Sequence, residues 1–147
     1  MVVNLFSPIP PIDDARVVAA IAAAEARTSG EIRVFISAGK TEQPVLEAEK
    51  QFERMNMTQT AARNGVLIYL SPASHTFAVV GDKGVHEKCG VVFWENLAAA
   101  MNEHFKNADF TQGLVTAIER AGALLAEYFP RQPDDRNELP NRIERPE

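Results

Sequence analysis

The stretch that decides the fold runs from position 62 to position 90 and reads ARNGVLIYLSPASHTFAVVGDKGVHEKCG. Residues 66–70 form an uninterrupted apolar run, which predicts a strand buried on both faces. Pro72 lies in the short connection that follows, so residues 76–80 are expected to return antiparallel. A glycine-flanked polar loop is predicted next, and it leads to a helix that begins at residue 93.

The segment before this stretch predicts a helix, a strand and a second helix. Asp13 and Asp14 open an alanine-rich run, and acidic residues favour a helix N-terminus. Residues 31–37 alternate apolar and polar side chains as a strand does, and residues 44–55 carry a helical apolar stripe. Together with the strand at 66–70 they form a strand–helix–strand unit, for which a right-handed parallel crossover is the default.

The segment after it predicts two helices and a tail. Residues 93–106 place apolar side chains on one helical face, and a second helical stripe follows. Pro130 ends that helix. We therefore divide the chain into an extended lead-in (1–12), one domain (13–129) and a proline-rich charged tail (130–147) that is partly docked.

The tail contains a short group of acidic and apolar residues: Asp134, Asp135, Glu138 and Leu139. Composition alone would make this segment a solvated charged tail. The turn-like sequence of residues 137–140 instead favours a strap that docks on the domain with Leu139 as its anchor. A supplementary cation site is the third interpretation.

The composition excludes several classes of protein. The 147 residues suit one domain with a single core, and 46% hydrophobic with 24% charged residues is typical of a soluble globular protein. A net charge of −5 argues against broad nucleic-acid binding, and no apolar run reaches the roughly 20 residues of a membrane span. The single cysteine, Cys89, excludes an internal disulfide, and residues 1–11 lack the features of a secretory signal. We therefore expect a cytoplasmic protein without a membrane span.

Five short segments stand in a fixed order along the chain: TSGEIRV at 28–34, RNGVLI at 63–68, GDKG at 81–84, FW at 93–94, and DF with GL at 109–114. Together they resemble the TPM domain, a family named after a plant thylakoid lumen protein, a photosystem II repair protein and a nematode acetylcholine-receptor modulator. The tail resembles the ending of a short, stand-alone bacterial subgroup of that family.

The resemblance implies a fold and two activities. The fold is a three-layer α/β/α sandwich, which matches a small mixed sheet built from one parallel crossover and one antiparallel hairpin. The activities are divalent-cation binding, with Ca²⁺ or Mg²⁺ as the cofactor, and acid phosphatase. The chain lacks the N-terminal Asp-x-x-Gly entry motif, signal peptide and C-terminal membrane helix of membrane-associated members, so the resemblance implies no membrane topology or named partner.

Asp82 and Lys83 lie between Gly81 and Gly84, where a strand ends and a helix begins. Three interpretations stay open for this loop. In the first it is a plain turn whose glycines adopt positive φ. In the second, Asp82 supplies a hard oxygen ligand to Ca²⁺ or Mg²⁺. In the third, the backbone amides of Gly81, Lys83 and Gly84 bind an anion, to which the Lys83 side chain adds charge.

The topology brings two more polar residues to the same end of the sheet. If the two central strands pair parallel, Glu31 and Asn64 lie at their N-terminal ends, and the antiparallel return brings Gly81 there as well. Carboxylate and amide oxygens suit a hard cation. We therefore predict a metal site formed by Asp82, Asn64 and Glu31.

Two alternatives compete with this metal site. Asn64 would bind its own backbone in an Asx turn, which needs no ligand. A ligand would otherwise bind at the carboxyl ends of the parallel strands, the usual place in open α/β sheets. Those ends correspond to residues 37–41 and 71–75.

The sequence leaves three functions open. The favoured one is a non-enzymatic TPM-type accessory or interaction module with an unknown protein partner and weak binding of a divalent cation, because no acid, base and nucleophile set is present. The first alternative is a metal-assisted acid phosphatase of low activity, in which a cation held by Asp82 would polarise the phosphoryl oxygen. The second is an anion-binding module that uses residues 81–84.

Overall fold

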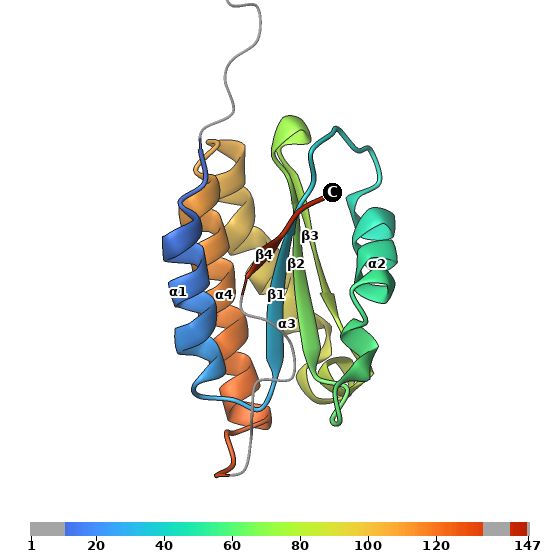
Figure 1. Cartoon of the computed structure of the whole chain (residues 1–147), viewed down its shortest axis with the longest axis vertical. Coiled ribbons are helices and arrows are strands. Elements are labelled where there is room, and N and C mark those ends of the chain that lie inside the picture. The colour runs from blue at the N-terminus through green and yellow to red at the C-terminus, as the bar shows by residue number, and fades with distance from the viewer. Residues whose placement is uncertain (1–10, 134–141, 147) are drawn as a thin grey trace, which may run out of the picture.

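The computed structural model describes residues 11–133 and 142–146. A four-stranded sheet lies between two layers of helices, with the strand order β3-β2-β1-β4 (Figure 1). The predicted three-layer α/β/α sandwich is therefore confirmed. In chain order the elements are α1 (Asp14–Glu25), β1 (Glu31–Ile36), α2 (Pro44–Arg54), η1 (Met57–Gln59), β2 (Gly65–Ser71), η2 (Pro72–Ser74), β3 (Thr76–Gly81), α3 (Lys83–Lys106), α4 (Phe110–Tyr128) and β4 (Ile143–Glu144).

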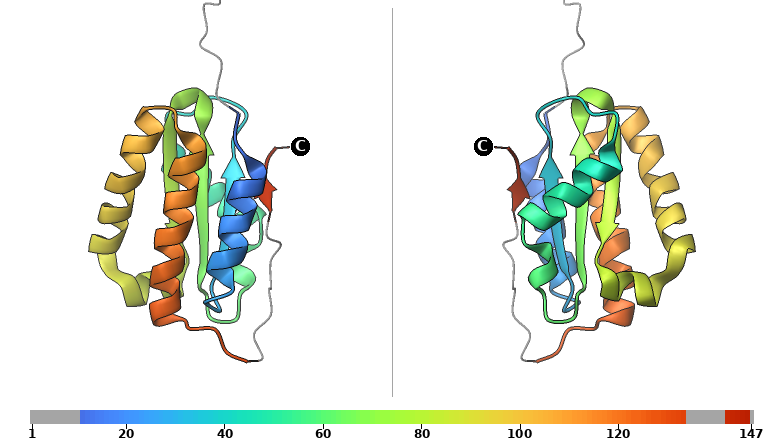
Figure 2. Two further views of the ribbon diagram at one scale, coloured as in Figure 1. Left: turned by 90° about the vertical axis from the view of Figure 1, so that its left-hand side faces the viewer. Right: turned by 90° about the vertical axis from the view of Figure 1, so that its right-hand side faces the viewer.

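The sheet is mixed, as the sequence predicts. β1 pairs parallel with β2, and Ile32 lies opposite Val66. β2 pairs antiparallel with β3, and Val66 lies opposite Gly81. Helix α2 makes the crossover between β1 and β2 and lies on one face with the short η1, whereas α1, α3 and α4 cover the other (Figure 2).

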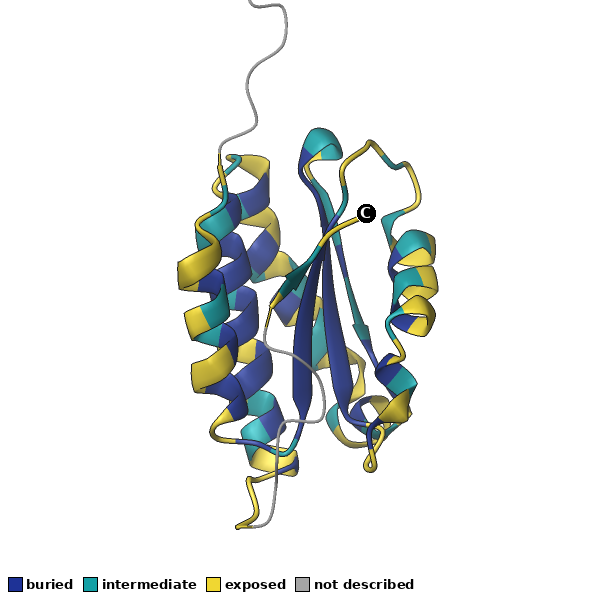
Figure 3. Ribbon diagram, viewed as in Figure 1, coloured by how far each residue is buried: buried dark blue, intermediate teal, exposed yellow. Residues whose placement is uncertain are grey.

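The core has two parts, one on each face of the sheet. On the larger side, Ile32, Val34 and Ile68 pack against α1, α3 and α4. On the smaller side, Phe35 and Leu67 pack with residues of α2. All seven residues of β2 are buried, which confirms the prediction of a strand buried on both faces (Figure 3).

The predicted loop after β3 is wrong. Helix α3 begins at Lys83, and its path is broken only at Gly90, where φ is +72°. The glycines at 81 and 84 do not have positive φ. A Cβ at Gly81 would collide with the Trp94 ring, and one at Gly84 would collide with the backbone carbonyl of Ala62. These two positions need glycine for close packing rather than for a turn.

The end of the chain joins the sheet. Ile143 and Glu144 pair parallel with Val34 and Phe35 of β1. The Glu144 carboxylate lies 2.6 Å from a guanidinium nitrogen of Arg33. The predicted strap residues Asp134, Asp135, Glu138 and Leu139 lie outside the described residues. β4 itself is too short to produce a strand pattern in the sequence.

None of the helices in the described part of the chain has both the length and the apolar character needed to cross a membrane.

Candidate functional site

The predicted site residues lie at one end of the sheet. Glu31 begins β1 and pairs with Gly65, and Gly81 ends β3 opposite Val66. Asn64 directly precedes β2, and its carbonyl accepts a hydrogen bond from the Glu31 amide at 3.4 Å. The three segments therefore meet at one end of the sheet, as the topology predicts. The contacts of each side chain then show its role.

Asp82 forms an ion pair with Arg63. The Arg63 Nε donates to Asp82 Oδ2 at 2.7 Å, and the Nη2 atom donates to Oδ1 at 2.8 Å. Arg63 adopts a left-handed backbone conformation with φ of +51°, and its hydrogen bond with Asp82 raises the pKa of the guanidinium. Asp82 is also the N-cap of α3, because its Oδ1 accepts from the Lys83 amide at 2.7 Å. Both carboxylate oxygens thus have donors from within the chain.

The anion site expected at Gly81, Lys83 and Gly84 is not preformed. The Lys83 amide donates to Asp82 Oδ1, and the Gly84 amide donates to the Arg63 carbonyl at 2.9 Å. An anion at this helix N-terminus would have to displace these hydrogen bonds. In an anion-binding nest the backbone amides are free to bind the anion.

Asn64 is buried by contacts with two neighbouring turns. Its backbone amide donates to Thr60 Oγ1 at 3.1 Å, and its side-chain amide donates to Ser29 Oγ at 3.3 Å. Its Oδ1 atom has no hydrogen-bond partner among the described residues. Asn64 therefore connects two turns, one through its backbone amide and one through its side chain, instead of forming the local Asx turn considered from the sequence.

Glu25 is a buried carboxyl that sequence analysis missed. Its Oε2 accepts from the Ile32 amide at 3.2 Å, and its Oε1 has no hydrogen-bond partner among the described residues. Burial, followed by a hydrogen bond with Glu31 and the charge of Glu31, raises the pKa of Glu25 to about 10. A signal was available: Val17, Ile21 and Glu25 are spaced four apart, so Glu25 continues the buried stripe of α1.

The acidic residues are not grouped as a metal centre. Within residues 11–133 and 142–146, no three His, Cys, Asp or Glu side chains are arranged to hold a metal ion. Of the predicted set, Asp82 accepts from Arg63, whereas Glu31 interacts with Glu25. The structure therefore assigns the three predicted ligands to different local contacts.

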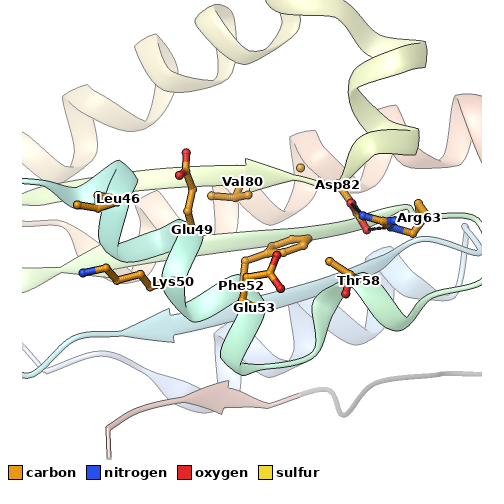
Figure 4. Close-up of a pocket in the computed structure, with 10 residues that line it drawn as sticks. Leu46, Glu49, Lys50, Phe52, Glu53, Thr58, Arg63, Val80 and Asp82 are labelled. Atoms are coloured by element: carbon orange, nitrogen blue, oxygen red, sulfur yellow. Dashed lines mark hydrogen bonds and ion pairs between the residues drawn. The ribbon is translucent and has the colours of Figure 1, made fainter.

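A groove of about 520 Å³ runs between α2 and the edge strand β3 (Figure 4). Its apolar lining comes from Leu46, Phe52 and Val80, and the Arg63–Asp82 pair stands at one end. Helix α2 adds the charged side chains of Glu49, Lys50 and Glu53 to the lining. The complete lining is Leu46, Glu49, Lys50, Phe52, Glu53, Thr58, Arg63, Val80, Gly81 and Asp82.

At the alternative site, the carboxyl ends of the parallel strands, the two loops are joined by hydrogen bonds. Ser71 Oγ donates to the Gly39 carbonyl at 2.8 Å, and the Thr41 amide donates to Ser74 Oγ at 2.8 Å. A second, smaller cavity of about 330 Å³ lies between α3 and α4, beside Phe93 and Leu124. The groove between α2 and β3 is thus the larger of these two cavities, and it includes part of the predicted loop.

The chain is similar to a known domain family and to solved protein structures. The family profile described as TPM domain matches residues 4–124. The NMR structure of the BA42 protein from the psychrophilic bacterium Bizionia argentinensis sp. nov. is 38% identical, with a TM-score of 0.85. The match covers 97% of this chain and 99% of the BA42 chain. No curated protein sequence gives a significant match.

Proposed function

The chain belongs to the TPM domain family, and from that premise we propose that it is a non-enzymatic interaction module that binds a segment of another protein in the groove between α2 and β3. The observation that carries this proposal is the groove itself: about 520 Å³ with an apolar floor of Phe52 and Val80 and charges along its rim. Concave, mostly apolar surfaces with a few polar groups are the usual binding sites of proteins.

The contacts of Asp82 support a binding role over catalysis. A general base or metal ligand at this position would need a carboxylate oxygen, and both oxygens accept hydrogen bonds from Arg63. Asp82 also caps α3, so any movement of its side chain would uncover a helix N-terminus. The alternative function, a metal-assisted acid phosphatase, requires that this ion pair open.

Two measurements on the same preparation test the proposal. The full chain is assayed with a panel of phosphomonoesters in the presence of Mg²⁺, Ca²⁺ or Mn²⁺, and a displayed library of random linear peptides is selected against it. We expect no turnover above the no-enzyme rate and selected peptides whose binding is lost in Val80→Arg, which fills the groove. The matched control is Leu124→Arg, which alters the second cavity. Turnover that Asp82→Ala abolishes would overturn the proposal and favour the phosphatase.

A second candidate function is weak binding of Ca²⁺ or Mg²⁺, and two buried oxygens favour it. Glu25 Oε1 and Asn64 Oδ1 are buried and have no hydrogen-bond partner among the described residues. Glu25 interacts directly with Glu31, and a divalent cation would replace the proton that keeps this pair stable. The donors would then be Glu25 and Glu31, with Asn64 as a third ligand and Asp82 excluded by its ion pair.

Amide NMR during titration with CaCl₂ tests this second function. We expect small shifts around Glu25 and Glu31 that grow as the pH rises, because the cation competes with a proton. Glu25→Gln should abolish these shifts, and Asp82→Asn should leave them unchanged. Shifts that disappear in Asp82→Asn but persist in Glu25→Gln would restore the original ligand set and contradict the revised one.

A further inference from the structure

The backbone of β3 has an unused hydrogen-bonding edge. The Asp82 amide donates to the Gly65 carbonyl at 2.9 Å, in register with the antiparallel pairing of β2 and β3. Because the hydrogen bonds of an antiparallel ladder alternate, Val80 and Ala78 also direct their backbone groups toward β2. Phe77, Val79 and Gly81 therefore direct their amides and carbonyls away from the sheet.

Nothing in the described part of the chain pairs with that edge. β3 is the terminal strand in the order β3-β2-β1-β4; Ala78 and Gly81 are buried, whereas Phe77 and Val79 are half-buried. Ala78 and Val80 face α2, whereas Phe77 and Val79 face the helices of the larger core. A strand added beside β3 would consequently place alternate side chains in the groove, next to Phe52 and Val80.

The opposite edge of the same sheet already carries such an addition. Two residues of the tail pair with β1, and the Arg33–Glu144 ion pair connects the added strand to its neighbour. Strand addition with main-chain hydrogen bonds for affinity and side-chain pockets for specificity is a recurrent mode of peptide recognition.

The charges of the groove indicate the chemistry of the added strand. Lys50 pairs with Glu47 at 3.6 Å, and Arg63 pairs with Asp82, so the cations of the groove wall have partners. Glu49 and Glu53 have no salt bridge among the described residues, although Glu53 lies in the field of Arg63. The uncompensated charge of the groove is negative, which complements lysine or arginine.

Building on the proposed function, we infer that the partner is an extended segment of another protein that adds to β3 as a fifth strand. One apolar side chain of this segment lies in the groove against Phe52 and Val80. A lysine or arginine two residues away on the same face lies beside Glu49 or Glu53. The main chain bonds to the half-buried residues Phe77 and Val79.

The test uses the uniformly ¹⁵N-labelled full chain and the peptide acetyl-Thr-Lys-Thr-Val-Thr-Lys-Thr-amide. One face of this probe presents Lys, Val and Lys, and the pattern is the same in both directions, so no strand direction is assumed. We expect saturable amide shifts centred on Phe77 and Val79, and slower hydrogen exchange of these two amides. A peptide with Glu in place of both Lys should bind about threefold or more weakly.

Two N-methylated probes separate strand addition from side-chain docking. One carries N-methyl groups on its odd residues and the other on its even residues, so each loses the amide donors of one edge only. Strand addition predicts that one isomer loses about tenfold or more in affinity and that the other binds as before. Equal loss in both isomers would overturn the inference.

A protein variant gives an independent test of the same edge. Val79→Pro removes an outward amide that β2 does not use, and proline is tolerated at such positions of edge strands. Its control, Val79→Ala, loses a similar apolar volume but keeps the amide. We expect peptide binding to be lost in Val79→Pro and retained within about threefold in Val79→Ala. If Val79→Pro does not fold, the N-methylated probes decide alone.

Three outcomes would overturn the inference. Each also shows whether the proposed function fails with it. Library peptides that bind Val79→Pro as well as the parent chain would keep the interaction module and remove strand addition. Amides of Phe77 and Val79 that exchange slowly before any peptide is added would mean that a second copy or another segment of this chain already occupies the edge. Phosphoester turnover abolished by Asp82→Ala would remove the interaction module itself.

Discussion

The two edges of the sheet face the same problem and solve it differently. At β1, the Glu25 carboxylate accepts from the Ile32 amide, and the tail strand pairs with Val34 and Phe35. At β3, the outward amides have no partner in the described part of the chain, and a groove runs beside them. Exposed strand edges promote unwanted pairing and are normally covered or charged. An edge covered by the chain's own residues is structural, whereas an edge left open beside a groove is available for binding.

The largest expected effect is at the covered edge, where Glu25 should make the free energy of unfolding depend on pH. The unfolded chain ionises Glu25 near the ordinary value of 4.5, whereas the folded chain holds its pKa at about 10. Between these values the folded state binds a proton that the unfolded state has lost, so stability falls as the pH rises. The full contribution is present only below about pH 4.5.

Urea unfolding of the parent chain and of Glu25→Gln from pH 5 to pH 8 measures this loss. The difference in unfolding free energy should shift in favour of the variant as the pH rises, by at most about 1.4 kcal/mol per pH unit. Glu95→Gln, on an exposed helix position, controls for the change in net charge. A difference that is constant across this range would mean that Glu25 is ionised in the folded protein.

The second prediction concerns the loss of the Arg33–Glu144 ion pair at the covered edge. Arg33 is 6% exposed, and one guanidinium nitrogen bonds Glu144 while another donates to the Met55 carbonyl at 3.2 Å. Glu144→Ala leaves a buried cation without its carboxylate, so we expect a loss of about 2–3 kcal/mol of unfolding free energy in urea unfolding. Adding Arg33→Met should recover at least about half of that loss, because the unpaired charge is then removed.

A surface pair in the same tail is the matched control for that prediction. Arg145 forms a two-point ion pair with Asp14 at 2.9 Å, but both side chains are substantially exposed. Arg145→Ala should therefore cost less than about 1 kcal/mol. Equal losses for Glu144→Ala and Arg145→Ala would show that burial of Arg33 contributes nothing and that β4 is held by the backbone alone.

Sequence patterns predict elements and pairings well here, but they do not predict partners of polar side chains. The alternation at Ile32, Val34 and Ile36 and the apolar run of β2 reflect burial, which recurs along each strand and is visible locally. Asp82 carries the same local signal whether it caps a helix, binds a metal or pairs with Arg63, 19 residues earlier. Only the fold decides among these roles.

Gly90 and β4 illustrate the same limit in two other ways. The glycine-flanked segment before residue 90 predicts a loop, yet Asp82 caps a helix there, and the backbone becomes non-helical only at Gly90, where a kink interrupts α3. The two residues of β4 are too few for a periodic pattern, and their pairing depends on contacts with β1 across the whole chain. Long-range contacts of this kind leave no local signature.

The last prediction concerns the ion pair at the open edge, where the expected effect is smallest. Asp82→Ala removes the cap of α3 together with the partner of Arg63, and a lost N-cap costs about 1 kcal/mol. Asp82→Asn keeps an oxygen that can cap the helix and removes only the charge, so its loss of stability should be smaller. Because the Arg63 side chain of the pair is 45% exposed, this loss should diminish in about 0.5 M NaCl. Thermal and urea unfolding of both variants, with and without salt, measures the two contributions separately. A gain in stability from Asp82→Asn would contradict this assignment, because it would mean that the folded state holds the carboxylate at a cost. The Arg63 end of the groove would then be a site for a charged ligand, and the difference between the two edges would lie in chemistry as well as in pairing.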